Sequence, residues 1–122
     1  MDIRLLTTDA DFTRYEHWVR SHPQGTLWQS CAWKQYQTAL RRTVRVYGAW
    51  EGTRMVASAL VVIDRTSFRL STWDIPRGPL WDLGLKTQDL GEKLLNHVEK
   101  DAMKDHCLSI FFSPSIPLFL SA

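Results

Sequence analysis

Residues 44–50, VRVYGAW, and residues 55–63, MVASALVVI, decide the architecture of this chain. The first stretch alternates with a period of two, which is typical of a half-buried strand. The second is nearly all apolar and rich in valine, which predicts a central strand covered on both faces. A turn at 51–52 joins them, and after a tight connection at 64–67 a third alternating stretch follows at 68–73. Strands with such short connections pair antiparallel, so the sequence predicts a meander.

The segment before the meander predicts one strand and two helices. Residues 3–6 form a short opening strand, and residues 7–9 supply caps for a helix that runs to about Arg20. Ser30 can cap a second helix. We expect that helix to end at residues 41–42, where two arginines favour the negative end of the helix dipole.

The segment after the meander predicts a loop, a helix and a last strand. Prolines and a glycine punctuate the loop at 75–82. A third helix starts near Thr87, and its buried stripe consists of Leu90, Leu94, Leu95, Val98 and Ala102. A helical crossover of this length leads to parallel pairing of the final strand at 107–112. The predicted order is strand, two helices, three strands, helix and strand, an α+β fold with a mixed sheet.

Charge is spread unevenly along a chain of one-domain length. The 122 residues carry a net charge of only +2, which by itself indicates neither a nucleic-acid nor a membrane partner. Residues 34–77, however, hold eight basic and three acidic residues, a net charge of +5. Seven of the eight are arginine, whose planar fork suits phosphate. This segment predicts either an anionic ligand or a solvated sheet face.

Cysteine usage and hydropathy predict a cytoplasmic protein. Cys31 and Cys107 lie far apart in apolar stretches, as reduced core cysteines do. His17 and His22 do not combine with Cys31 in any metal-binding spacing, so we expect no metal site. The first residues lack the pattern of a secretory signal, and the longest apolar run is about half of what a bilayer requires. We therefore expect no transmembrane segment.

The last ten residues, 113–122, do not fit a finished domain. They are apolar, uncharged and broken by two prolines. A free end of this composition would expose large apolar side chains to water. We therefore expect residues 1–112 to form a partial domain, and residues 113–122 to be an irregular end where the chain is truncated or altered.

Two local motifs resemble the N-terminal half of the FemAB family, whose members are aminoacyltransferases that build peptidoglycan cross-bridges. The first motif is HPQGTLWQS at 22–30, followed by Trp33. The second is PRGPL at 76–80, followed by Asp82. The resemblance spans roughly residues 3–112. The predicted element order is similar to the first part of a GCN5-related N-acetyltransferase (GNAT) fold.

The resemblance implies transfer of an amino acid from aminoacyl-tRNA to the stem peptide of a peptidoglycan precursor, either lipid-linked or nucleotide-linked. It implies no cofactor and no DNA partner, and it leaves room for a peripheral contact with the inner membrane face. The reaction is aminolysis of an activated ester, which needs positioning, an oxyanion donor and a proton route but no side-chain nucleophile. Because family members are much longer, we expect little or no transferase activity from this chain alone.

The loop of the second motif holds three candidate site residues. Arg77 lies between a proline that stiffens the backbone and Gly78, which frees it, so its guanidinium can be held towards a phosphate or carboxylate. The alternative is an arginine that pins the loop by bridging Asp74 or Asp82. Asp82 either accepts a proton or orients the attacking amine, or it serves as a cap or ion-pair partner.

The other candidates are a lysine and four aromatic residues. Lys34 on the second helix either reaches a diphosphate or is a solvated surface lysine. Trp33 and Tyr36 on the same helix are either a ligand platform or, as we favour, part of the core. Trp73 and Trp81 flank the loop, and they either stack on a sugar or base or pack beneath it.

Two other functions compete with this interpretation. A small-molecule N-acetyltransferase would hold the pyrophosphate of acetyl-CoA in a glycine-rich loop. This chain has Leu80 where glycine is expected, and Pro79 removes a backbone donor. A non-catalytic module would bind RNA or another polyanion through arginines and interleaved tryptophans. Neither alternative accounts for both motifs.

Overall fold

A computed structural model of the chain describes residues 2–23, 25, 30–65, 71–75, 80–81, 89–104 and 107–112. In chain order the elements are β1 (Asp2–Leu5), α1 (Asp9–Ser21), α2 (Cys31–Ala39), β2 (Thr43–Glu51), β3 (Arg54–Arg65), β4 (Ser71–Ile75), β5 (Leu80–Trp81), α3 (Asp89–Lys104) and β6 (Cys107–Phe112). The irregular end expected at 113–122 lies outside the described residues.

The predicted meander is confirmed. β2 and β3 form a long antiparallel hairpin that runs from the pair Thr43–Ile63 to the pair Glu51–Arg54. Its turn contains Gly52 at φ 62°, in the left-handed region that glycine enters without steric cost. β3 continues through Arg65 and does not turn at residue 64, because its end still pairs with β4.

The complete sheet has the order β1-β2-β3-β4-β6, and β5 pairs with β3 beside this path. β4 and β6 pair in parallel, which confirms the predicted crossover through α3. β4 spans residues 71–75, whereas the sequence predicted 68–73, and residues 68–70 lie outside the described part. β5 was not predicted, since two residues are too few for any alternation to show.

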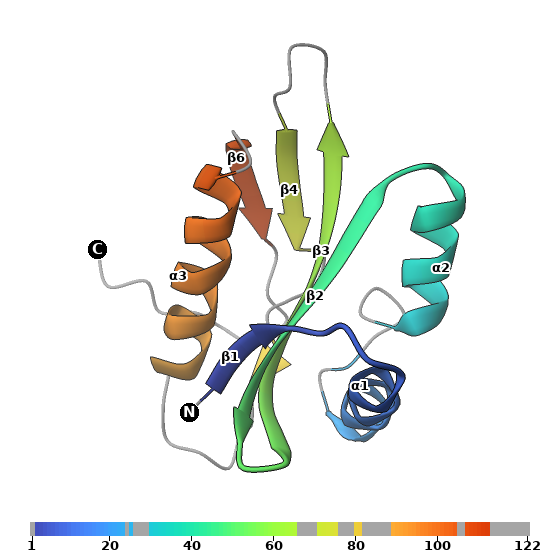
Figure 1. The fold of residues 1–122 in the computed structure, drawn as a ribbon, viewed down its shortest axis with the longest axis vertical. Helices are drawn as coiled ribbons and strands as arrows, with labels where there is room; N and C mark the ends of the chain where they lie inside the picture. The colour runs from blue at the N-terminus through green and yellow to red at the C-terminus, as the bar shows by residue number, and fades with distance from the viewer. Residues whose placement is uncertain are drawn as a thin grey trace.

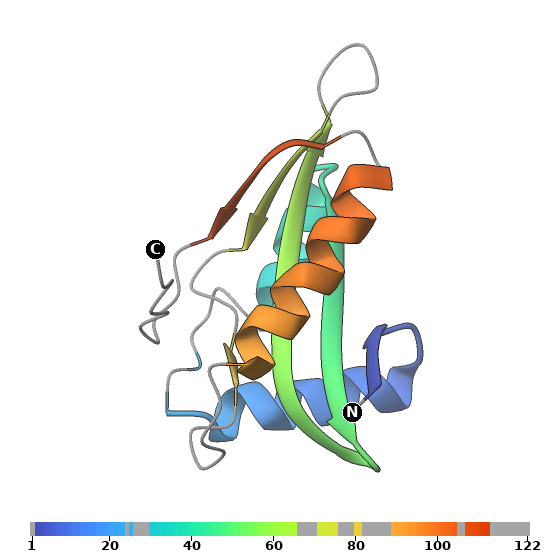
Figure 2. The same ribbon diagram turned by 90° about the vertical axis from the view of Figure 1, so that its left-hand side faces the viewer.

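The helices cover both faces of the sheet. α3 lies on one face, and α1 and α2 lie on the other (Figure 1). Figure 2 shows α3 running along the long β2–β3 hairpin, with α1 and α2 behind it. Within the described ranges, no helix is long and apolar enough to cross a membrane.

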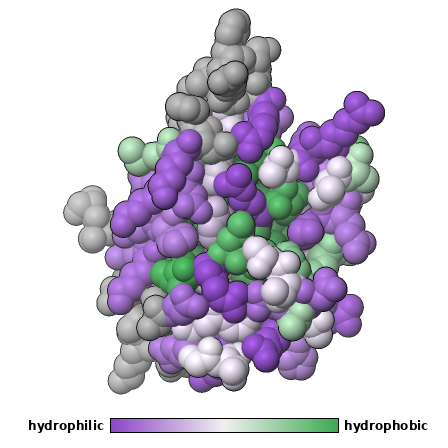
Figure 3. Space-filling view, in the orientation of Figure 1, coloured by the Kyte–Doolittle hydropathy of each residue, from purple (hydrophilic) through white to green (hydrophobic). Residues whose placement is uncertain are grey.

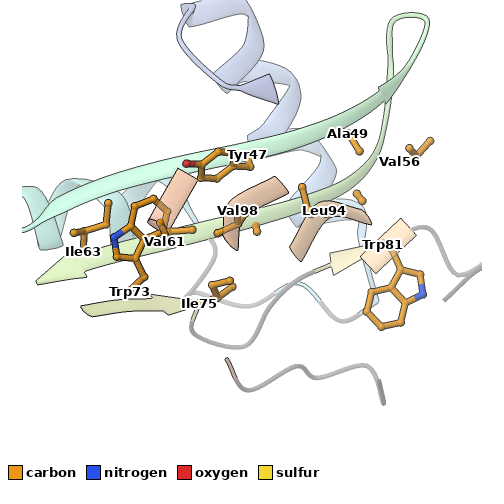
Figure 4. Close-up of a cluster of buried hydrophobic side chains, with 13 residues drawn as sticks. Tyr47, Ala49, Val56, Val61, Ile63, Trp73, Ile75, Trp81, Leu94 and Val98 are labelled. Atoms are coloured by element: carbon orange, nitrogen blue, oxygen red, sulfur yellow. The ribbon is translucent and has the colours of Figure 1, made fainter. Parts of the chain in front are cut away.

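Side chains of β3 alternate between two apolar cores, as a strand covered on both faces requires. Ala59 and Val61 face the α3 side, where the core includes Trp73 and Val98 (Figure 4). Leu60 enters the core beneath α1 and α2. The prediction for this strand is therefore confirmed.

Both predicted N-terminal caps lie where they were expected. The hydroxyl of Thr8 accepts the N–H of Asp11 at 3.1 Å and caps α1. The hydroxyl of Ser30 accepts the N–H of Trp33 at 3.1 Å and caps α2. α2 ends at Ala39, two to three residues earlier than predicted.

Candidate functional site

The two motif segments meet at the end of α1. The Nε2 atom of His22, in the first motif, lies 2.7 Å from the carbonyl oxygen of Trp81, which directly follows the second motif. A carbonyl oxygen can only accept, so Nε2 carries the proton and donates it. His22 is buried, and its ring lies edge-on to Trp18 with 5.1 Å between centroids. The fold therefore brings together segments that are 59 residues apart.

Gly25 of the first motif allows the chain to fold back against α1. Its N–H donates to the carbonyl of His22 at 2.9 Å. A Cβ atom at position 25 would lie 2.0 Å from the backbone oxygen of Val19, which no side chain can relieve. Close approach of two backbone segments thus explains this glycine.

Three of the predicted site residues, Arg77, Gly78 and Asp82, lie outside the described residues. Ile75, which precedes the second motif, and Leu80, its last residue, are both fully buried. The roles expected for the three loop residues stay predictions.

Trp73 and Trp81 lie in the core that faces α3 (Figure 4). Trp73 is fully buried, and Trp81 is 5% exposed. The guanidinium of Arg45 lies 5.3 Å above the Trp73 ring. These positions fit the packing alternative, so we assign neither tryptophan to a ligand.

The three candidates on α2 are divided between two sides of the helix. Trp33 is half-buried and stacks on Tyr36, with 5.3 Å between ring centroids. Tyr36 is 55% exposed, so the expectation that it belongs to the core is wrong. Gln37 occupies the buried position instead, and its side-chain oxygen accepts a hydrogen bond from Arg42 at 2.8 Å. Lys34 and Tyr36 are two positions apart, so their side chains point about 160° away from each other around the helix axis.

Lys34 lies beside a groove between α1 and the start of α2. The groove has a volume of about 550 Å³, and its lining includes Phe12, Glu16 and Cys31. The ammonium of Lys34 lies 4.9 Å from the centroid of the Phe12 ring. Arg4 and Arg20 form ion pairs with carboxylates, whereas Lys34 forms none with another described residue.

Glu16 fastens the start of α2 to α1. Its two carboxylate oxygens accept the N–H of Cys31 and the Nε–H of Arg20, each at 3.1 Å. Burial would raise the pKa of Glu16, but hydrogen bonds from Cys31 and Arg20 outweigh burial and hold the pKa below its ordinary value. An ionised carboxylate at a helix N-terminus satisfies a free N–H and the helix dipole.

Cys31 is held as a thiol near neutral pH. Burial, followed by the hydrogen bond to Glu16, raises the pKa of its thiol to about 11. His17 lines the same groove. Within the described ranges, no three His, Cys, Asp or Glu side chains come together as metal ligands.

Sequence reasoning did not single out Phe12 or the links made by Glu16 and His22. Glu16 contacts a residue 15 positions away, and no local pattern encodes such a contact. His22 was noted within the first motif, which was the one available signal for its bond to Trp81.

Comparison with known proteins identifies the family of this chain and the fold that it shares with solved structures. The chain matches the FemAB family over residues 9–121. The solved structure of FemX superimposes with a TM-score of 0.79 at 18% identity, and the match covers 95% of this chain and 28% of FemX. A ribosomal-protein-alanine N-acetyltransferase from Brucella melitensis biovar Abortus 2308 gives a TM-score of 0.71 at 13% identity, covering 96% of this chain and 83% of that one. No curated protein matches.

A GNAT family acetyltransferase from Staphylococcus aureus is also similar, with a TM-score of 0.66, 10% identity and coverage of 99% of this chain and 91% of that one. At such identities these structures show the fold alone, and they confirm the expected GNAT-like α+β fold. Because the family match takes in nearly the whole sequence, the chain belongs to the FemAB family.

Proposed function

We propose that this chain is the precursor-binding part of an aminoacyltransferase that builds peptidoglycan cross-bridges. In this proposal Lys34 contacts the diphosphate of the precursor at the groove between α1 and α2. The diphosphate is common to lipid-linked and nucleotide-linked precursors, so the same lysine serves either form. Family membership supports the reaction class, and the environment of Lys34 carries the assignment of the site.

The ammonium of Lys34 is held in place but not neutralised. The Phe12 ring fixes it from one side by a cation–π contact, which leaves its other N–H donors free to bind an anion. No aspartate or glutamate occurs between Glu16 and Glu51 in the sequence. A phosphate oxygen would gain a charge-assisted hydrogen bond from this ammonium, and Arg20, which binds Glu16, offsets part of the negative charge that Glu16 and Asp9 place in the groove.

The chemistry that we assign needs no nucleophile from the protein. The amino group of the stem peptide attacks the ester of aminoacyl-tRNA, a new amide bond forms, and the tRNA hydroxyl leaves with a proton. We propose that Arg77 is a second phosphate contact and that Asp82 orients the amine. Both substrates occur in the cytoplasm, where we place the reaction. The chain spans 28% of FemX, and we assign to it binding of the precursor rather than turnover.

Titration calorimetry with the nucleotide-linked precursor tests this assignment. We expect Lys34→Gln to weaken binding about tenfold or more, since a hydrogen bond to a charged group contributes roughly 1.5–3 kcal/mol. Lys100→Gln on α3 removes the same charge from the other face and should bind like the parent chain. Equal affinities of the two variants would contradict the role of Lys34.

Titration calorimetry also distinguishes the proposed function from its main alternative. A small-molecule N-acetyltransferase would share the fold of the GNAT neighbours. Micromolar affinity for acetyl-CoA, together with no affinity for the precursor, would favour that function. We expect no binding of acetyl-CoA, because Leu80 is buried in the core at the position where a pyrophosphate loop would need glycine.

A further inference from the structure

The outer side of α2 carries no charge. Its exposed residues are Ala32, Gln35, Tyr36, Thr38 and Ala39, and the C-cap Leu40 is exposed as well. Tyr36 and Leu40 lie one turn apart and are 55% and 49% exposed. A solvated helix normally carries charged side chains on its outer side. This surface is therefore composed like one that is covered by a partner.

Two arginines follow directly, at the C-terminal end of the helix. The N–H of Arg41 donates to Thr38 at 2.9 Å and the N–H of Arg42 donates to Gln37 at 3.1 Å, which is the Schellman pattern of helix termination. Arg41 occupies the left-handed position at φ 65°, where glycine is favoured. A cationic side chain is kept there at a conformational cost, which points to a use for its charge.

The sequence around this surface favours an anionic partner. From His17 to Trp50 there are four arginines and one lysine and no acidic residue. Arg41 and Arg42 are both exposed. Tyr36, Leu40, Arg41 and Arg42, which we call the α2 patch, thus combine exposed apolar groups with positive charge.

We propose that the α2 patch docks on the interface of a membrane that contains anionic lipids. A tyrosine ring with its polar tip suits the headgroup level, leucine suits the layer beneath it, and arginines gain from a negative surface. Figure 3 shows hydrophobic side chains continuing between α2 and α3, over β1 and β2, where Leu5 is 37% exposed. An exposed leucine adds nothing to binding of RNA, so the combination favours lipid.

This inference goes beyond the proposed function, because Lys34 points to the opposite side of α2 from Tyr36 and takes no part in the docking. The test below measures membrane binding alone. Its outcome therefore does not depend on the calorimetry of Lys34→Gln.

Sedimentation of the full chain with vesicles tests the proposal. We expect binding to vesicles of equal parts phosphatidylglycerol and phosphatidylcholine, and at least tenfold weaker binding to pure phosphatidylcholine. Arg41→Gly should weaken binding to the anionic vesicles about fivefold, the effect of one arginine near such a surface. It retains the helix cap, so loss of folding cannot explain the effect. Leu40→Ser should weaken binding to a similar degree.

Lys104→Gln, an exposed position on α3, removes the same charge from the opposite face of the sheet and serves as the control. It should bind anionic vesicles almost as the parent chain does. Equal binding to both kinds of vesicle, or equal effects of Arg41→Gly and Lys104→Gln, would overturn the proposal. So would salt-sensitive binding to an RNA oligonucleotide that Arg41→Gly weakens while vesicle binding is unchanged.

Discussion

The helices on the two faces of the sheet are attached by different means. On one face, α3 buries a stripe of Leu94, Val98 and Ala102, each no more than 1% exposed. Within the described ranges, one side-chain hydrogen bond, from Tyr47 to Asp101 at 2.8 Å, joins α3 to the sheet. On the other face, α1 and α2 also cover an apolar core, but several directed polar links fasten them. These links are Trp18 to Ser58, Arg4 to Asp11, Cys31 to Glu16 and His22 to Trp81.

This difference shows on which face of the sheet the helices are held in a defined position. Apolar contacts are non-directional and permit small shifts of a helix. Hydrogen bonds depend on distance and angle, so each link fixes one element against another. The face with the links holds His22 and Leu80, the ends of the two motifs that the structure describes there, together with Lys34. The helices that are attached by directed hydrogen bonds are therefore the ones that form the candidate site.

Truncation of the α3 stripe should have the largest effect on stability. We expect Leu94→Ala to lower the free energy of unfolding by about 2–5 kcal/mol, because it opens a cavity in a fully buried site. Trp18→Phe keeps most of the ring but removes the donor to the buried hydroxyl of Ser58, 2.9 Å away, and should cost about 1 kcal/mol. Denaturant unfolding measures both. If Trp18→Phe cost as much as Leu94→Ala, the contrast between the two faces would be lost.

Reactivity of Cys31 sharpens the comparison on the α1–α2 face. With a pKa of about 11, its thiolate fraction at pH 8 is about a hundredfold below that of a thiol with the ordinary value of 9. Alkylation by iodoacetamide in the folded chain should be slower by a similar factor than in the unfolded chain, as peptide mass spectrometry can measure.

Glu16→Gln should accelerate this alkylation several-fold, because it removes the negative charge beside the thiol. His17→Gln is the matched control, since His17 lines the same groove. Fast alkylation of the parent chain that His17→Gln slows would instead indicate an activated thiol–imidazole pair.

The two faces also differ in how far the sequence predicts them. The α3 stripe and the β3 strand follow from spacing alone, because apolar burial repeats with the period of the element. The caps Thr8 and Ser30 follow from local side-chain chemistry. Contacts such as Cys31 with Glu16 join residues on different elements, and nothing local encodes them. Resemblance of the motifs, not periodicity, is what pointed to the segments that His22 joins.

On α2, too, a contact with a residue beyond the end of the helix could not be predicted from the local sequence pattern. The sequence favoured a core position for Trp33 and Tyr36 over a ligand platform. The buried position is instead Gln37, whose amide is satisfied by Arg42. A buried polar residue with a partner beyond the end of the helix cannot be recognised from a hydrophobic pattern. Because Gln37 faces the core, Tyr36 and Leu40 are left exposed.

The smallest expected effect concerns acid, and it tests whether the link from β1 to α1 is electrostatic. The guanidinium of Arg4 binds both oxygens of Asp11 at 2.6 and 3.1 Å, and this hydrogen bonding holds the pKa of Asp11 below its ordinary value. Arg4→Met should lower the free energy of unfolding at pH 7 by up to about 1 kcal/mol, the upper end for a pair whose cation is partly solvated.

A carboxyl whose pKa is lowered in the folded chain contributes stability that is complete above its unfolded pKa, near 4, and is lost as the pH falls through the lower folded value. The difference in stability between the parent chain and Arg4→Met should therefore be constant from pH 7 to about pH 5 and shrink below pH 4. Arg14→Met, at an exposed position of α1, loses the same charge and should differ from the parent by an amount that does not change with pH. A difference for Arg4→Met that stayed constant down to pH 3 would mean that Arg4 stabilises the chain by packing over Trp50 of β2, at 4.9 Å, and not by its ion pair with Asp11.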